Sequence, residues 1–248
     1  AGVDECIHKQ TDPDHLLKII DKAIEKNLAY RMLQIQKRKS SSGEAAPVFE
    51  SPNMKEVREL AMNFMNRSDN LLITGERGSG KGYLARWIHE NGDRSRHPYC
   101  PIGLPALDTS LFRRELFGNE KGAFTGAEAE REGLFEIARG GTVVLDEIGE
   151  IEASNQSALL GVVERKEFMR VGGNANRPLG ARLISISNRD LERAIREGRF
   201  MADLYDRLRT LHIEMPPLRE RREDILIIAR EILARLGKEN GRVVQEID

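Results

Sequence analysis

The stretch NLLITGERGSGKGYLARWIHE, residues 70–90, changes character twice within 21 residues. An apolar run is followed by four glycines in the eight residues of GERGSGKG, and then by a pattern that places Leu84, Trp87 and Ile88 on one side of a helix. A strand, a Gly-rich loop and a helix in this order are typical of a phosphate-binding loop, where backbone N–H groups and the helix dipole face the phosphates. The alternative is a chance Gly-rich turn.

This loop predicts a set of nucleotide-binding residues. Lys81 is expected to reach the β and γ phosphates, while the small residues let the backbone approach them. The whole predicted set is Gly75, Glu76, Arg77, Gly78, Ser79, Gly80, Lys81 and Gly82. Gly82 stands where the general motif has Ser or Thr, so the hydroxyl that usually binds Mg²⁺ is missing.

A second polar feature follows the buried-strand pattern TVVLDEIGE, residues 142–150. Acidic residues at the carboxyl end of a parallel strand lie where ligands bind in open α/β sheets. We therefore expect Asp146 to hold Mg²⁺, directly or through water, and Glu147 to polarise an attacking water. For the two acidic residues alone, a solvated loop is the competing interpretation. Asn188, after the run ARLISISN, could orient water at the γ-phosphate or serve only as a turn residue.

Several apolar runs define the fold class. Besides residues 70–75, 141–149 and 181–188, the segment 210–216 is a candidate strand, and residues 98–102 are a weaker one because Pro101 interrupts them. Helical-looking stretches separate these runs, as parallel strands buried on both faces require. The sequence predicts an α/β fold with a mostly parallel five-stranded sheet flanked by helices.

The composition excludes some functions. The 248 residues include 39 Lys and Arg against 40 Asp and Glu, and a net charge of −1 gives no electrostatic footprint for nucleic acid or an anionic membrane. Cys6 and Cys100 have no metal-ligand spacing and suit reduced thiols. No apolar run approaches ~20 residues, so nothing is expected to span a membrane. These features predict a soluble cytoplasmic protein.

The segment GAFTGA, residues 122–127, has neither helical periodicity nor strand alternation. It is predicted to form a loop in which Phe124 is bare, because its neighbours are too small to cover it. Exposed loop residues of this kind often make functional contacts. The alternative is a Gly-rich loop tucked under a neighbouring helix.

Six segments together carry a resemblance to a known family. They are GAFTGA, ELFGNEKG (115–122), GGTVVLDEIGE (140–150), RVGG (170–173), SNRDL (187–191) and PPLRERREDI (216–225). Over about residues 49–236 the chain resembles the AAA+ domain of the bacterial enhancer-binding proteins, NtrC-like response regulators that activate sigma-54 RNA polymerase.

The resemblance implies further roles. ATP and Mg²⁺ would be the cofactors, Asn188 would sense the γ-phosphate, and Arg207 would complete the site of a neighbouring subunit in a ring. Sigma-54 RNA polymerase would be the partner, contacted by the loop residues Gly122, Ala123, Phe124, Thr125, Gly126 and Ala127.

The resemblance also implies a division of the chain. Residues 1–39 would be a receiver-domain remnant and a linker helix whose apolar stripe pairs two subunits or packs on receiver strands. Residues 40–48 would be a flexible linker, 49–218 the AAA+ α/β subdomain, and 219–248 the start of a truncated helical lid with a helix over about 222–236. DNA would be bound only through an absent C-terminal domain.

Three departures from the family pattern lie around the expected reaction centre. Relatives have Glu at the position of Gly82, and Asn-Cys at Gly103 and Leu104, where the Asn restrains the catalytic glutamate. At Met201 they have the first of two arginines that reach the nucleotide of the neighbouring subunit. Two hypotheses therefore stand: an ATPase motor that moves the GAFTGA loop, and a nucleotide-responsive binding or assembly module of a two-component response regulator with little turnover.

Overall fold

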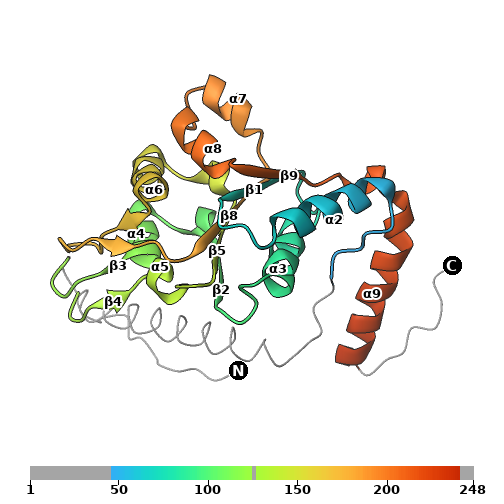
Figure 1. Ribbon diagram of the computed structural model, residues 1–248, viewed down its shortest axis with the longest axis horizontal. Helices are drawn as coiled ribbons and strands as arrows, with labels where there is room; N and C mark the ends of the chain where they lie inside the picture. Colours follow the sequence, from blue (N-terminus) through green and yellow to red (C-terminus); the bar gives the residue numbers. More distant parts are fainter. Residues whose placement is uncertain (1–45, 125–126, 241–248) are drawn as a thin grey trace, which may run out of the picture.

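The structure, a computed structural model, describes residues 46–124 and 127–240. Its centre is a five-stranded parallel sheet with the strand order β2-β5-β8-β1-β9 (Figure 1). The strands are β1 (Leu71–Thr74), β2 (Tyr99–Gly103), β5 (Thr142–Asp146), β8 (Arg182–Ser187) and β9 (Leu211–Glu214). The predicted α/β fold is confirmed, including the weaker candidate β2, which tolerates Pro101 because it is an edge strand.

Alternate residues of each central strand enter different cores, because successive side chains of a strand point to opposite faces. On β1, Leu71 and Ile73 pack on one side and Leu72 on the other. The first core lies against α2 (Pro52–Phe64) and α3 (Lys81–Asn91). The second lies against the helices of the opposite face, which are α4 (Thr109–Phe117), α5 (Leu134–Ile137), α6 (Ala153–Arg165), α7 (Leu191–Arg196) and α8 (Ala202–Leu208).

Short elements complete the domain. Three 3-10 turns are η1 (Leu104–Ala106), η2 (Ile148–Glu150) and η3 (Leu218–Glu220). The sequence did not predict two hairpins of two-residue strands, which are too short to show a periodicity. They are β3 (Gly118–Asn119) with β4 (Arg131–Glu132), and β6 (Glu167–Phe168) with β7 (Arg177–Pro178). A parallel bridge between Asn119 and Val171 joins the first hairpin to the loop of the second.

The last described helix, α9 (Arg222–Asn240), extends past the expected end at residue 236. It stands at one end of the domain, beyond α2 and opposite the β3–β4 hairpin (Figure 1). The expected receiver remnant and linker helix of residues 1–39, and most of the expected linker of residues 40–48, lie outside the described residues. Val48, at the end of that linker, is buried.

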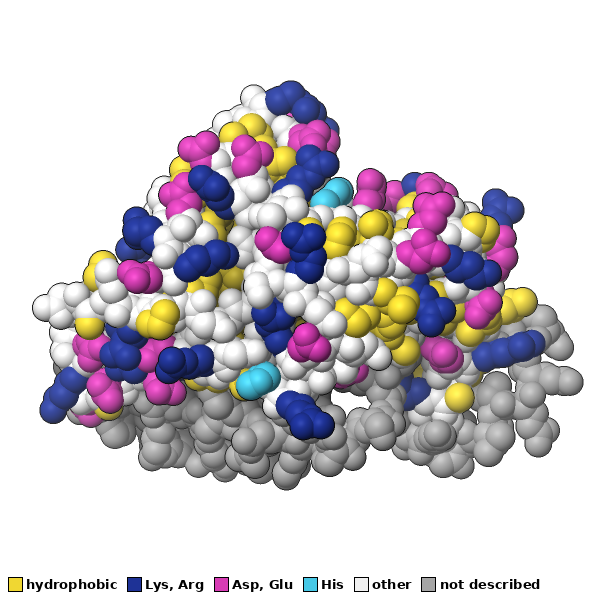
Figure 2. Space-filling model, viewed as in Figure 1, with side chains coloured by type: hydrophobic (Ala, Val, Ile, Leu, Met, Phe, Trp, Pro, Cys, Tyr) yellow, Lys and Arg dark blue, Asp and Glu magenta, His cyan; other side chains and the backbone are white. Residues whose placement is uncertain are grey.

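Acidic and basic side chains are interspersed over the face seen in Figure 2, in keeping with the net charge of −1. Cys100 is buried without a disulfide, and burial raises the pKa of its thiol to about 11. Within residues 46–124 and 127–240, no helix combines the length and apolarity that a membrane crossing requires.

Candidate functional site

The phosphate-binding loop predicted from the sequence lies between β1 and α3, at the carboxyl edge of the sheet. Gly80 precedes the first residue of α3 with a φ of 92°, a left-handed conformation that costs any other residue energy. At Gly75, with a φ of 142°, a Cβ would come within 2.6 Å of the Met215 carbonyl oxygen. Two of the glycines are therefore required by backbone geometry, one by conformation and one by a close approach.

Lys81 is the first residue of α3 and is only 8% exposed. Its Nζ donates hydrogen bonds of 2.8 Å to the carbonyl oxygens of Gly75 and Glu76. Burial lowers the pKa of Lys81, while the nearby carboxylates of Asp146 and Glu147 oppose that shift. The ammonium group is thus held inside the loop beside two acidic residues, in a position to bind an anionic ligand.

The acidic pair and the predicted sensor meet next to the loop. Asp146 ends β5, and Glu147 follows it with a φ of 58° and donates its N–H to Asp146 Oδ1 at 3.0 Å. Asn188 follows the neighbouring strand β8, and its Nδ2 donates to Glu147 Oε1 at 3.3 Å. Gly103, the first residue of the Asn-Cys departure, lies opposite Asp146 in the register of β2. The amide that holds Glu147 in this chain therefore comes from Asn188.

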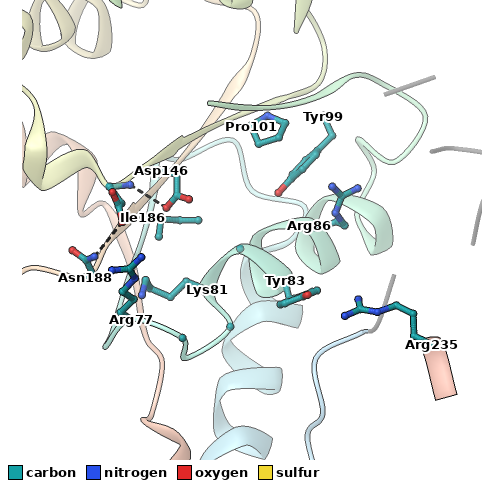
Figure 3. A pocket seen from close by; sticks show the side chains of 14 residues that line it. Arg77, Lys81, Tyr83, Arg86, Tyr99, Pro101, Asp146, Ile186, Asn188 and Arg235 are labelled. Atoms are coloured by element: carbon teal, nitrogen blue, oxygen red, sulfur yellow. Dashed lines mark hydrogen bonds between the residues drawn. The ribbon is translucent and has the colours of Figure 1, made fainter. Parts of the chain in front are cut away.

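These groups line one cavity of about 510 Å³, shown in Figure 3. Arg77, Lys81, Arg86 and Arg235 bring basic groups to it, and Asp146 and Glu147 bring acidic ones. The guanidinium of Arg86 stacks 4.8 Å from the centre of the Tyr99 ring. Four basic side chains around two carboxylates suit a polyphosphate that carries a metal ion.

The donor set fits Mg²⁺ only together with a phosphate ligand. Among the described residues, no three His, Cys, Asp or Glu side chains form a group that could hold a metal ion. Mg²⁺ in phosphate sites is often bound by one or two carboxylates, phosphate oxygens and water. Asp146 meets that requirement, whereas Gly82 has no side chain to add a ligand.

Arg207 lies apart from this cavity, near the carboxyl end of α8, with a side chain that is 60% exposed. Its Nε is 3.5 Å from Glu164 Oε1. Met201 precedes α8 in an extended conformation, and its sulfur is 3.7 Å from the hydroxyl of Ser157. Because α8 begins only after Met201, residues 201 and 207 do not share one continuous helix.

The GAFTGA segment connects β3 to β4, and its residues 125–126 lie outside the described residues. A turn closes it, with Gly122 N donating to the Ala127 carbonyl at 2.8 Å. The expectation of a bare Phe124 is wrong: the side chain is half-buried, and the guanidinium of Arg114 lies 4.6 Å from its ring centre. The covering group comes from α4 rather than from the small neighbours in the loop.

A cluster of ion pairs that the sequence did not predict supports this loop. The side chain of Arg170 is 6% exposed and bonds both carboxylate oxygens of Glu136, at 2.7 and 2.9 Å. The same guanidinium reaches Glu120 at 3.4 Å, two residues before GAFTGA begins. Gly172 packs so closely that a Cβ there would lie 2.6 Å from the Cβ of Ala123. The RVGG turn and the GAFTGA loop are therefore in direct contact.

Two further arginines, also missed from the sequence, link the phosphate loop to the start of α9. Arg219 makes a two-pronged contact with Glu76, with both N–O distances 2.7 Å. Arg221 is buried and donates to the Ser79 carbonyl oxygen at 2.6 Å. Both ends of the segment Glu76 to Ser79 are thus held by the chain that leads into α9.

Comparison with known proteins agrees with this geometry. Residues 48–214, more than half of the chain, match the family model of the sigma-54 interaction domain. The chain belongs to the sigma-54 interaction domain family. The match includes the phosphate loop, the acidic pair, Asn188 and the GAFTGA segment.

Relatives in this family are regulatory proteins. The chain is 38% identical to the regulatory protein AtoC of Escherichia coli over 100% of its own length and 54% of that protein. It is 45% identical to a Nif-specific regulatory protein of Rhizobium leguminosarum over 79% of its length and 55% of that protein. The chain therefore spans about half the length of these two curated relatives.

A solved structure extends the likeness beyond the family match. NtrX from Brucella abortus in complex with ADP superposes with a TM-score of 0.75 and 28% identity. The superposition covers 98% of this chain and 54% of that one. The two chains therefore share one fold.

Proposed function

We propose that this chain is the ATP-driven part of a transcriptional activator of sigma-54 RNA polymerase. The observation that carries the proposal is the meeting of Lys81, Asp146, Glu147 and Asn188 in one cavity of a sigma-54 interaction domain. ATP with Mg²⁺ is the proposed ligand, and hydrolysis would move the GAFTGA loop. Crystal structures of NtrX from Brucella abortus in complex with ADP and with ATP support a nucleotide at this site.

Each residue has a chemical task in this proposal. Mg·ATP supplies the transferable phosphoryl group and a metal charge that offsets the phosphate charge. Lys81 would exchange its two carbonyl partners for phosphate oxygens, and Asp146 would hold the metal. Glu147 accepts a proton from water, and Asn188 fixes the direction of that carboxylate. The remaining loop residues, Gly75 to Ser79, Gly80 and Gly82, present backbone N–H groups.

Arg207 would act at the nucleotide site of a neighbouring subunit and not at the site of its own chain. It lies outside the cavity of its own chain and is largely exposed. An arginine that reaches the phosphates from a second subunit stabilises the charge that develops during transfer. We therefore propose a ring of subunits in which Arg207 completes the neighbouring site. Pairing through residues 1–39 would join two subunits.

The GAFTGA residues 122–127 are the proposed contact with sigma-54. Small residues allow the loop to change shape, and the contacts of Arg170 and Gly172 place a second turn behind it. Because Phe124 is half-buried under Arg114, presenting its ring to a partner requires that this stack opens.

The division of the chain into a linker, an α/β subdomain of residues 49–218 and a lid that begins at residue 219 belongs to the same proposal. A cytoplasmic location and DNA binding through another domain are also part of it.

A second function, a nucleotide-responsive module with little turnover, is favoured by specific residues. Met201 contributes no positive charge, and Gly103 contributes no amide beside Asp146. The hydrogen bond from Asn188 to Glu147 compensates for Gly103, because an amide still holds the Glu147 carboxylate. The ATPase is therefore the better supported function, with slow turnover expected.

Calorimetry with ATP and Mg²⁺ tests the nucleotide site. Lys81→Ala should abolish the binding heat, because the variant removes the buried ammonium group that meets the phosphates. Lys55→Ala, at an exposed lysine of α2, is the matched control and should bind as the wild type does. Equal affinity of all three proteins would show that the phosphate-loop assignment is wrong.

Capture of purified sigma-54 in the presence of a transition-state mimic of ATP tests the proposed partner. Thr125→Ala should lose sigma-54 while keeping nucleotide affinity, since none of the described residues of the loop lines the cavity. Capture that is unaffected by this substitution would remove the GAFTGA loop from the proposed interface.

A further inference from the structure

Asn70, at the entry of β1, is buried with 6% of its surface exposed, and its side chain joins two distant elements. Its Nδ2 donates to the backbone carbonyl of Arg207 at 2.8 Å. Its Oδ1 accepts a hydrogen bond from Lys166 Nζ, which follows α6, at 3.2 Å. Its own carbonyl accepts from Leu211 N at 3.0 Å. One amide therefore ties the start of β1 to the ends of α6 and α8.

The contact matters because of where it falls on α8. The last four carbonyls of a helix have no partner within the helix, and this helix has only seven residues. Asn70 provides a partner for the carbonyl of Arg207 itself, helped by the hydroxyl of Thr210 at 3.2 Å. Fixing that peptide group fixes the direction in which the Arg207 side chain leaves the helix.

The side chain of Arg207 has no comparable anchor among the described contacts. Its ion pair with Glu164 is 3.5 Å long between groups that are 60% and 41% exposed. Exposed pairs of this kind hold side chains weakly. The buried amide beneath the backbone is therefore the stronger determinant of where the guanidinium lies.

We infer that Asn70 is a positioning residue for Arg207, and that it acts on the nucleotide of the neighbouring subunit rather than on that of its own. This inference rests on the proposed function, in which Arg207 reaches across a subunit interface. The hydrogen-bond partners described for Asn70 do not line the cavity, but the strand that follows it leads through Thr74 into the phosphate loop. A role on its own nucleotide is therefore the competing explanation, and the experiment must separate the two.

Asn70→Ala should lower ATP turnover by about 10- to 100-fold, since a displacement of about 1 Å of a catalytic group can cost that much. Asn70→Asp keeps the side-chain volume and the acceptor for Lys166 but loses the donor to Arg207. Its ATP turnover should therefore fall as that of Asn70→Ala does. The control is Asn91→Ala: Asn91 Nδ2 also donates to a helix carbonyl, that of Trp87 at 2.9 Å, without any link to Arg207. That variant should keep wild-type turnover.

Rings that mix two variants show whether Asn70 acts on the nucleotide of its own subunit or on that of the neighbouring subunit. Lys81→Ala subunits lack a working nucleotide site but keep Arg207, whereas Arg207→Ala subunits have the opposite defect. In an equal random mixture, about one interface in four joins a good site to a good arginine, so turnover should recover to about a quarter of wild type. This mixture is the positive control for the ring itself.

Asn70→Ala subunits should then behave as Arg207→Ala subunits do. Mixed with Lys81→Ala they should regain turnover, and mixed with Arg207→Ala they should stay inactive. The reverse pattern would show that Asn70 serves its own phosphate loop and would overturn the inference. A wild type without turnover, or a positive control without recovery, would instead contradict the proposed function. If both Asn70 variants failed to fold, as judged by thermal melting, a positioning role would be excluded as well.

Discussion

Replacing Gly82 by Ala should stabilise the protein. Gly82 is the second residue of α3, its φ is not positive, and a Cβ there would meet no atom within 4 Å. Alanine is favoured over glycine in a helix by about 0.5–1 kcal/mol, mainly because glycine loses more backbone entropy on folding. For a domain of this size, that gain corresponds to a rise in the melting temperature of about 1–4 °C.

Gly80→Ala is the matched control, two residues earlier in the same loop. Space is also available there, because the nearest atom to a new Cβ is the Met215 methyl group at 3.8 Å. The φ of 92° differs, however, and a left-handed conformation costs a side-chain-bearing residue about 1–2 kcal/mol. This variant should melt about 2–8 °C lower than the wild type.

Thermal and urea unfolding without nucleotide measure both effects. Opposite shifts for two Gly→Ala substitutions so close together can arise only from the backbone conformations described for the loop. If Gly82→Ala lowered the melting temperature, or if both variants shifted it in the same direction, the reasoning about the loop would be refuted.

Three further predictions concern other contacts. Arg219→Ala and Glu76→Ala should weaken ATP affinity equally, and the double variant should weaken it no further, because each substitution breaks the same contact. Additive effects in calorimetry would contradict this prediction. Burial lowers the pKa of His212, whose Nε2 lies 2.8 Å from Thr74 Oγ1, so stability present above pH 6.5 should fall as the pH drops through the lowered pKa. His212→Gln should lose this pH-dependent part of the stability, so its melting temperature should change less between pH 7.5 and pH 5.5 than that of the wild type. An equal change in both proteins would refute the prediction. Met201→Arg should raise ATP turnover, and an unaltered rate would show that residue 201 does not reach a neighbouring nucleotide.

The sheet and the meeting of the predicted polar residues at one cavity could be predicted because their signals are local. Each central strand is a continuous apolar run, and residues that follow the carboxyl ends of parallel strands must meet at one edge. That is why Lys81, Asp146, Glu147 and Asn188 could be assigned to one site before their positions were known. The hydrogen bond between Asn188 and Glu147 was not predictable, since it depends on side-chain geometry.

The contacts that the sequence did not reveal join residues far apart in the chain. Arg170 and Glu136 are 34 residues apart, and Arg219 and Glu76 are 143 apart, so no spacing pattern points to either pair. In a chain with 32% charged residues, many other pairings are equally consistent with the composition. Arg114 is only about ten residues from Phe124, but it covers the ring from a different element, so the cover was missed as well.

The most direct test of the central proposal is ATP turnover measured against the concentration of the chain. Because each site needs Arg207 of another subunit, the specific activity should rise steeply with concentration. It should disappear in Glu147→Gln while ATP binding remains. A specific activity that is the same at all concentrations, or that survives in Glu147→Gln, would contradict the proposal.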